Sequence, residues 1–129
     1  MAPLILLDTH VIIWLYEGDL ARIPAAVQQR LRIEQLGLSP FVQLELGYLK
    51  EVGRIRPTPD EIVRDLSARL ELVIADVTAA AVCNIALGLS WTRDPFDRLL
   101  AAHATLAGLP LITKDETLRR HLPLAWWSD

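Results

Sequence analysis

Short apolar runs separated by helical patterns are the feature that most constrains the fold of this chain. The run PLILL (3–7) shows no alternation of polar and apolar residues, which is typical of a strand buried on both faces of a parallel sheet. Further strands are predicted at LGLS (36–39), LELVIAD (70–76) and LPLIT (109–113), and PLAWW (123–127) predicts a last strand at the edge.

Helical patterns lie between these runs, at 9–18, 24–35, 40–52, 58–70, 78–88 and 94–108. Ser39 before Pro40 is a typical helix start, and the glycines at 18, 53 and 108 are typical helix ends. Strands that alternate with helices predict an α/β domain with a mainly parallel sheet and helices on both faces.

Length and composition indicate one domain over residues 1–129, because 129 residues with 52% hydrophobic content suit a single core. The net charge of −3 gives no overall attraction to a nucleic acid. The single cysteine, Cys83, cannot form an internal disulfide and is expected to be an inert core residue in a reducing compartment. Neither a secretory signal nor a membrane-length apolar run is present, so the chain is expected to be cytoplasmic and without membrane association.

Two aspartates directly follow predicted strands. Asp8 follows the first strand, and Asp115 lies just beyond the strand at 109–113. In parallel α/β sheets, ligands bind outside the carboxyl ends of the strands, so both residues are expected at the edge where ligands bind. Each aspartate is also explained as the N-cap of a following helix, Thr9 onward or ETLRRH (116–121).

Glu45 is placed on the apolar stripe of its predicted helix, where Phe41, Val42, Tyr48 and Leu49 are its neighbours three and four positions away. Burying an uncompensated carboxylate costs several kcal/mol, so such a residue is normally paired or bound to a metal. The alternatives are an internal salt bridge, for example to Arg93 or Arg98, and a helix twisted enough for Glu45 to reach solvent.

Asp94 and Asp97 lie at the start of the helix in RDPFDRLLAAHATLAG (93–108). Asp94 is placed as an N-cap before Pro95, and Asp97 occupies the position of a capping-box carboxylate. Locally, helix capping explains both residues.

Taken together, the strand-end and helix aspartates and Glu45 could gather in one crevice. Clustered carboxylates repel and raise one another's pKa, and a divalent cation relieves that repulsion. A site built from oxygen ligands suits Mg²⁺ or Mn²⁺ rather than Zn²⁺. The histidines at 10, 103 and 121 show no metal-ligand spacing, and His103 is expected to be packed in an apolar helix face.

Three segments carry a resemblance to a known family: LLDTHVIIWL, LSPFVQLELGYLKEVGRI and DPFDRLLAAHATLAGLPLITKD. Their residues, order and spacing resemble the PIN-domain family, and within it the VapC-type toxins of toxin–antitoxin pairs. The resemblance covers nearly the whole chain. Its most specific part is the Asp-Pro-Phe-Asp helix start followed by a strand that ends in Thr-x-Asp.

The resemblance assigns the family's catalytic and metal-binding acids to Asp8, Glu45, Asp97 and Asp115. Asp97 matches better than Asp94 because it directly precedes the LLAAHA-like segment, so Asp94 is expected to be a cap or an indirect support. Many relatives end the later strand in Thr-x-Asn, so the match at Asp115 is the loosest. Thr9 and Thr113 resemble small hydroxyl residues that line the family's site.

The resemblance implies a Mg²⁺- or Mn²⁺-dependent endoribonuclease that acts as a toxin and is neutralised by a cognate antitoxin. The antitoxin is expected to lay an extended or helical segment over an apolar groove and the acidic site, with a basic side chain among the carboxylates. WLYEG (14–18) and AWW (125–127) offer apolar surface for a homodimer or for the antitoxin, although core packing explains them equally well.

The RNA backbone is expected to be held by basic residues near the acids, for which ordinary surface pairing is the alternative: Arg93, Arg98, Lys114, Arg119 and Arg120. From the residues alone, two other classes of function stay open. One is another metal-dependent phosphoryl-transfer enzyme, such as a DNA nuclease or a phosphatase. The other is a non-catalytic binding module whose acids are helix caps and salt bridges.

Overall fold

A five-stranded sheet lies at the centre of the computed structural model, which describes residues 4–128. The strand order is β3-β2-β1-β4-β5, and every pairing between neighbours is parallel. The strands are β1 (Leu4–Leu7), β2 (Gln35–Leu38), β3 (Val73–Ile74), β4 (Leu111–Ile112) and β5 (Ala125–Trp126). The predicted α/β fold is confirmed, with β5 at the edge as expected.

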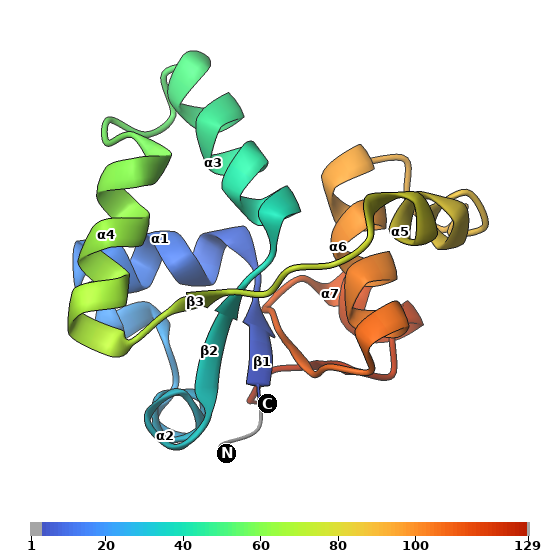
Figure 1. Ribbon diagram of the computed structural model, residues 1–129. Helices are drawn as coiled ribbons and strands as arrows, with labels where there is room; N and C mark the ends of the chain where they lie inside the picture. The colour runs from blue at the N-terminus through green and yellow to red at the C-terminus, as the bar shows by residue number, and fades with distance from the viewer. Residues whose placement is uncertain (1–3, 129) are drawn as a thin grey trace.

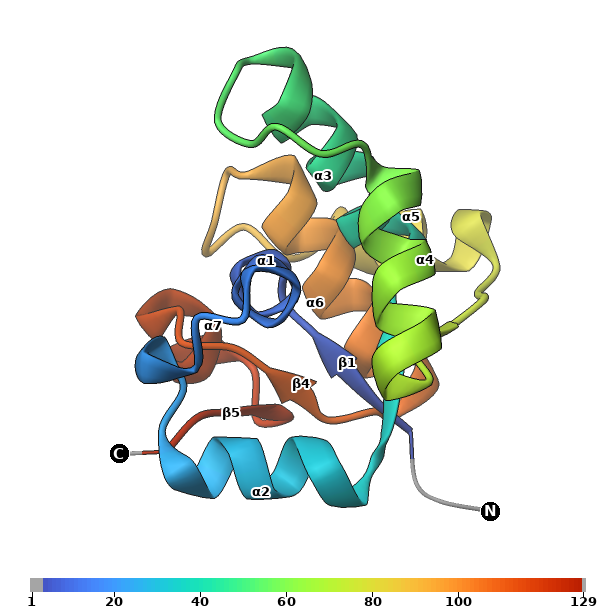
Figure 2. The same ribbon diagram turned by 90° about the vertical axis from the view of Figure 1, so that its left-hand side faces the viewer.

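Helices cover the sheet on both faces. Figure 1 shows α1 and α4 on one side of β1 and β2, and α5, α6 and α7 on the other. The helices are α1 (Thr9–Glu17), α2 (Ala25–Ile33), α3 (Pro40–Glu51), α4 (Pro59–Leu70), α5 (Ala79–Ala86), α6 (Pro95–Ala107) and α7 (Glu116–His121). A 3₁₀ helix, η1 (Leu20–Arg22), which the sequence patterns did not indicate, connects α1 to α2 (Figure 2).

The two central strands lie in the core of the protein. Ile5, Leu6 and Leu7 in β1 are completely buried, as are both residues of β4. Gly37 allows β2 to pack closely beside β1, because a Cβ atom at that position would lie 2.8 Å from the Leu4 Cδ1 atom and 3.1 Å from the Ile5 carbonyl oxygen. Burial of both faces explains why these runs are uniformly apolar.

Several boundaries differ from the sequence prediction. β2 begins at Gln35 and ends at Leu38, because Ser39 leaves the strand to cap α3, and its hydroxyl accepts a hydrogen bond from the Phe41 N–H at 3.3 Å. β3 has two residues instead of seven, because the chain after α4 turns through a left-handed conformation at Glu71 (φ 57°). Pro3, included in the first predicted strand, lies outside the described residues.

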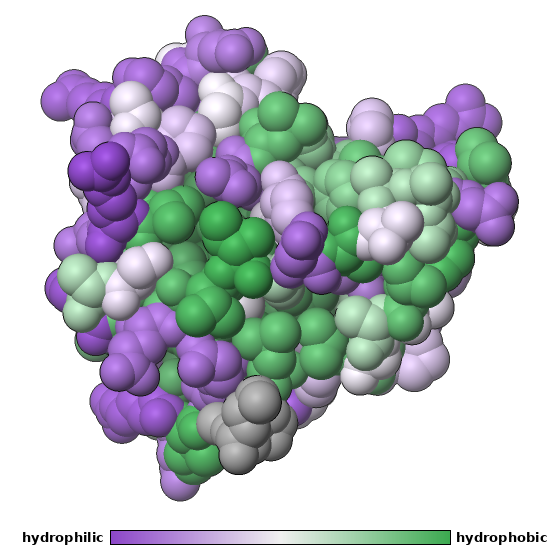
Figure 3. Space-filling view, viewed as in Figure 1, coloured by the Kyte–Doolittle hydropathy of each residue, from purple (hydrophilic) through white to green (hydrophobic). Residues whose placement is uncertain are grey.

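Cys83 is exposed, so its expected place in the core is wrong. α5 buries Val82 and Ala86, which are four residues apart, and this leaves Cys83 on the outer face. Apolar residues gather over α5 in Figure 3, whereas polar residues cover the tip where α3 leads into α4. None of the helices within residues 4–128 is long and apolar enough to cross a membrane.

The tryptophans of WLYEG (14–18) and AWW (125–127) belong mainly to the core. Trp127 is buried, and Trp14 and Trp126 pack against the core with part of their surface exposed. Trp14 also contacts Trp127, with ring centroids 6.2 Å apart. Core packing is therefore the better of the two interpretations of these segments.

Candidate active site

Asp8 is held in a fixed position where β1 ends. The residue is 5% exposed, and its side chain accepts two short hydrogen bonds, from the Thr9 N–H at 2.7 Å and from the Thr113 hydroxyl at 2.6 Å. Thr113 follows β4, which pairs with β1, so parallel pairing brings the two strand ends together. Asp8 caps α1, as expected, and it also lies at the ligand-binding edge of the sheet.

Asp115 is connected to Asp8 through Thr113. The Thr113 hydroxyl donates to Asp8 and accepts a hydrogen bond from the Asp115 N–H at 3.0 Å. The Asp115 carboxylate accepts from the Leu118 N–H at 2.8 Å and caps α7. The capping role is confirmed, and one carboxylate oxygen of Asp115 remains without a hydrogen-bond partner in the described chain.

His10 is a site residue that the sequence patterns did not indicate. Its Nε2 atom accepts a hydrogen bond from the Lys114 N–H at 3.0 Å, so the proton of the neutral ring is on Nδ1, which lies 3.6 Å from the Asp8 Oδ2 atom. Burial lowers the pKa of His10, against the opposing charges of Asp8 and Asp115. The signal in the sequence was its position two residues after a strand-end aspartate.

Glu45 turns inward from α3, as its place on the apolar stripe predicted. It accepts a short hydrogen bond from the Thr9 hydroxyl. Within residues 4–128 it forms no salt bridge, and Arg98 instead donates to the Thr92 carbonyl oxygen at 2.7 Å. Burial raises the pKa of Glu45; the Thr9 hydrogen bond lowers it, and the charges of Asp8 and Asp94 raise it further.

Asp94 and Asp97 have different roles at the start of α6. The Asp94 carboxylate caps the helix and accepts from the N–H groups of Phe96 at 2.8 Å and Asp97 at 3.2 Å. The Asp94 N–H donates to the Thr92 hydroxyl at 3.3 Å, so Asp97 does not complete a capping box. Within residues 4–128 the Asp97 carboxylate has neither a hydrogen bond nor a salt bridge, and the capping explanation does not hold for this residue.

The electrostatics show that the carboxylates converge on Asp97. Burial raises the pKa of Asp97 to about 7, and the negative charges of four carboxylates contribute to the rise: Asp94, Asp8, Asp115 and Glu45. The charges of the other three acids of the expected site, and of Asp94, therefore all act on Asp97. A half-buried carboxylate among other carboxylates keeps its proton to a higher pH than a solvent-exposed one does.

A PIN-domain family model matches residues 5–121, almost the whole described chain. The chain belongs to the PIN-domain family. It is 32% identical to Ribonuclease VapC22 of Mycobacterium tuberculosis over 120 residues, which cover 91% of each chain. This similarity makes it a VapC-type member of the PIN family.

Solved structures show the same fold. The chain matches VapBC2 from Rickettsia felis bound to a promoter DNA fragment with a TM-score of 0.66 and 16% identity, covering 97% of this chain and 99% of that one. It matches DNA-bound VapBC from Salmonella typhimurium with a TM-score of 0.65 and 23% identity, covering 100% and 98%. A toxin–antitoxin complex from Klebsiella pneumoniae gives 0.65 at 20% identity, covering 95% of both chains.

The donor groups of this PIN domain suit a hard divalent cation, since the converging ligands are carboxylates and the charge on Asp97 is uncompensated. Within residues 4–128, however, no three His, Cys, Asp or Glu side chains lie close enough together to hold one ion. Asp8 is already fixed, so Glu45 and Asp97 are the side chains that would have to turn toward it. Ordering a side chain costs about 0.5–1.5 kcal/mol, which is small beside the repulsion that a cation removes.

Proposed function

We propose that this PIN domain is a Mg²⁺- or Mn²⁺-dependent endoribonuclease whose catalytic acids are Asp8, Glu45, Asp97 and Asp115. The observation that carries the proposal is the half-buried Asp97 carboxylate, which has no hydrogen bond or salt bridge within residues 4–128 and whose pKa is raised by burial and by four other carboxylates. Such a cluster is costly unless a cation occupies it. The choice of RNA as substrate is supported by the similarity to Ribonuclease VapC22.

Each acid has a distinct part in the proposed site. Asp8, fixed by Thr9 and Thr113, and Asp97 would be the principal ligands, while Glu45 would bind the ion directly or through water. Asp115 would support a second or outer position. When bound, the cation would polarise a phosphodiester oxygen and lower the pKa of a water molecule, the nucleophile of hydrolysis.

Basic residues next to the acids would hold the RNA backbone. Arg93 precedes α6, Lys114 precedes α7, and Arg120 lies within α7, and all three side chains are exposed. Their charges would attract the phosphates flanking the scissile bond and would not depend on the base sequence. Arg98 is committed to the Thr92 carbonyl oxygen and stabilises the loop before α6.

Cleavage of a pool of transfer and ribosomal RNAs by the purified protein tests the proposal. Wild type is expected to cut in Mg²⁺ or Mn²⁺ and to stop in chelator, and Asp97→Asn is expected to lower the rate at least about 100-fold because it removes a proposed principal ligand. Single-stranded DNA and a phosphomonoester substrate serve as competitors, since the other phosphoryl-transfer enzymes would prefer one of them. Equal behaviour of wild type and Asp97→Asn in every condition would favour the binding module.

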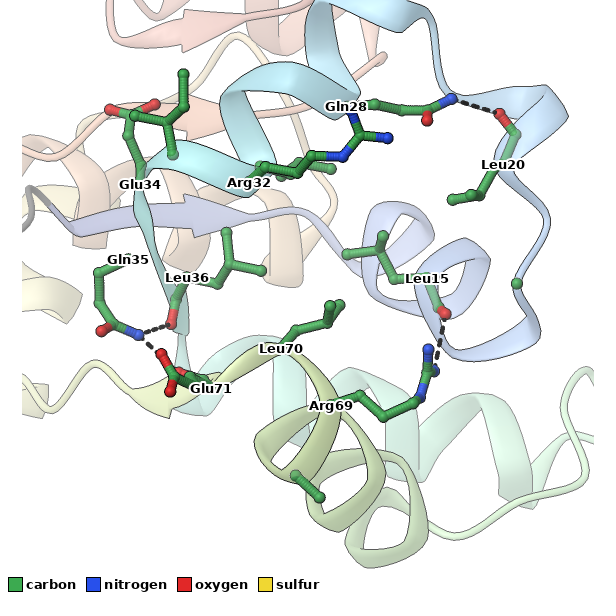
Figure 4. Close-up of a pocket in the computed structure, with 14 residues that line it drawn as sticks. Leu15, Leu20, Gln28, Arg32, Glu34, Gln35, Leu36, Arg69, Leu70 and Glu71 are labelled. Atoms are coloured by element: carbon green, nitrogen blue, oxygen red, sulfur yellow. Dashed lines mark hydrogen bonds between the residues drawn. The ribbon is translucent and has the colours of Figure 1, made fainter.

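We also propose that a cognate antitoxin packs into an apolar pocket of 590 Å³ between α1, α2, β2 and α4. Leu15, Leu36 and Leu70 point toward one another in this pocket, and polar residues such as Arg69 and Gln35 surround them (Figure 4). Ile33 at its rim is 68% exposed. Apolar surface of this kind, rimmed by polar groups, suits a helix or strand of a partner, and the antitoxin complexes of the structural neighbours support that partner.

A further inference from the structure

A buried hydrogen bond joins the two helices that carry Glu45 and Asp97. His103 in α6 is 1% exposed, and its Nδ1 atom lies 2.8 Å from the hydroxyl of Ser39, which is completely buried and caps α3. The His103 ring also makes an edge-to-face contact with Phe41 in the first turn of α3, with centroids 6.1 Å apart. Residues 64 positions apart in the sequence are thereby fixed to each other.

Histidine is a costly choice for this position. Ser39 Oγ accepts from the Phe41 N–H and also shares one proton with His103 Nδ1, so Nδ1 has a partner in either tautomer of the ring. Nε2 is buried and has no hydrogen-bond partner among the described residues. A buried donor or acceptor without a partner destabilises the folded chain, and Nε2 is one or the other in either tautomer. An apolar side chain would avoid that cost, so packing alone does not account for His103.

We propose that His103 is a positioning residue, which through Ser39 holds α3 and α6 at the separation that lets Glu45 and Asp97 serve one cation. The inference rests on the proposed function. Glu45 lies six residues after Ser39, and Asp97 lies six residues before His103. Each carboxylate is therefore about 9 Å along its helix from the buried contact, at 1.5 Å per residue.

Each carboxylate lies about 9 Å along its helix from the bond between His103 and Ser39, so a small change at that bond moves the carboxylate. A tilt of α3 by about 10° around Ser39 would move Glu45 by about 1.5 Å, from the rise per residue of the helix. Displacements of about 1 Å can cost a catalytic site about 100-fold. A second ring contact between the helices, Tyr48 with Phe96, has centroids 5.9 Å apart, but Tyr48 is 51% exposed. The buried hydrogen bond between His103 and Ser39 therefore fixes the two helices more firmly than the contact between Tyr48 and Phe96.

Mn²⁺ binding, measured by calorimetry on the whole folded protein, tests the inference. His103→Leu removes the hydrogen bond and is expected to weaken Mn²⁺ binding about tenfold or more. His103→Asn places an amide oxygen near the position of Nδ1, so it is expected to restore most of the affinity. Val27→Ala, in α2, removes buried methyl groups far from the acids and is the matched control for lost stability, with unchanged Mn²⁺ affinity.

A second variant keeps the inference testable if His103→Leu does not fold. Ser39→Ala removes the same bond together with the α3 cap. The double variant is expected to lose no more Mn²⁺ affinity than Ser39→Ala alone, because His103→Leu then has no bond left to break. Wild-type affinity in His103→Leu or in Ser39→Ala, or additive losses in the double variant, would overturn the positioning role and leave the proposed nuclease intact. Absence of Mn²⁺ binding by wild type would overturn the metal site itself.

Discussion

At the scale of single residues, Asp97 and Asp94 show how one helix start can carry two kinds of aspartate. The Asp94 carboxylate accepts hydrogen bonds from two backbone N–H groups. The Asp97 carboxylate is half-buried and faces the charges of four other acids. The pKa of about 7 therefore reflects the cost of burying the Asp97 charge first, and then repulsion from the four other acids. Function and stability oppose each other at this residue.

This repulsion predicts an unusual pH dependence for the stability of the metal-free protein. Between the ordinary pKa of 3.8 and about 7, folded Asp97 keeps a proton that the unfolded chain has released, so this residue makes the free energy of unfolding fall as pH rises. Asp97→Asn removes this loss and is expected to stabilise the protein by about 1 kcal/mol at pH 8.

Urea unfolding of wild type and Asp97→Asn in chelator, at pH 4 and pH 8, measures the effect. The two curves are expected to lie close together at pH 4, where Asp97 is largely protonated in the folded state. If Asp97→Asn is less stable than wild type at pH 8, Asp97 makes a stabilising contact and does not carry stored repulsion.

The sequence indicated most of the acids of the proposed site, for particular reasons. Asp8 and Asp115 were predictable because each follows a buried strand, and Glu45 because it interrupts an apolar stripe. Asp97 needed the family resemblance, since its local pattern fits a cap. His10 was missed although it lies two residues after a strand-end aspartate, because its contact is with the N–H of Lys114, 104 residues away, and no local pattern marks such a pairing.

At the scale of elements, the helices were predicted better than the strands. Ser39 and Asp94 cap helices in the positions that their sequence patterns indicated. β3 was overestimated because apolar character alone does not fix pairing: its two residues are exposed, and it pairs with β2 at one edge of the sheet. Element ends depend on tertiary contacts, and local propensity describes them poorly.

The proposed antitoxin pocket is also a property of elements, since α1, α2, β2 and α4 contribute to it together. Ile33→Asp adds a charge at the rim of the pocket and is expected to abolish co-purification with the product of the neighbouring antitoxin gene, while RNA cleavage stays unchanged. Leu87→Asp is the matched control, because Leu87 is 78% exposed and does not line the pocket. Retained co-purification by Ile33→Asp would place the antitoxin elsewhere.

At the scale of the whole molecule, the proposed site exists only in the folded chain. Its acids lie between positions 8 and 115 and come from two strand ends and two helices, which the parallel sheet and the contact between α3 and α6 bring together. The net charge of −3 is consistent with RNA as substrate, because a bound cation would reverse the local charge where phosphate approaches. The acids that folding brings together are thus the same acids that are proposed to bind the cation.

Calorimetric titration with Mn²⁺ of wild type, Asp97→Asn and Asp94→Asn, at several pH values, tests the central claim most directly. Wild type is expected to bind, with affinity falling about tenfold per unit below pH 7 as Asp97 takes up a proton. Asp97→Asn is expected to bind at least about tenfold more weakly, whereas Asp94→Asn keeps its helix cap and stays within a few-fold of wild type. Equal affinities for wild type and Asp97→Asn, or no binding by wild type, would contradict the claim that these acids form a metal site.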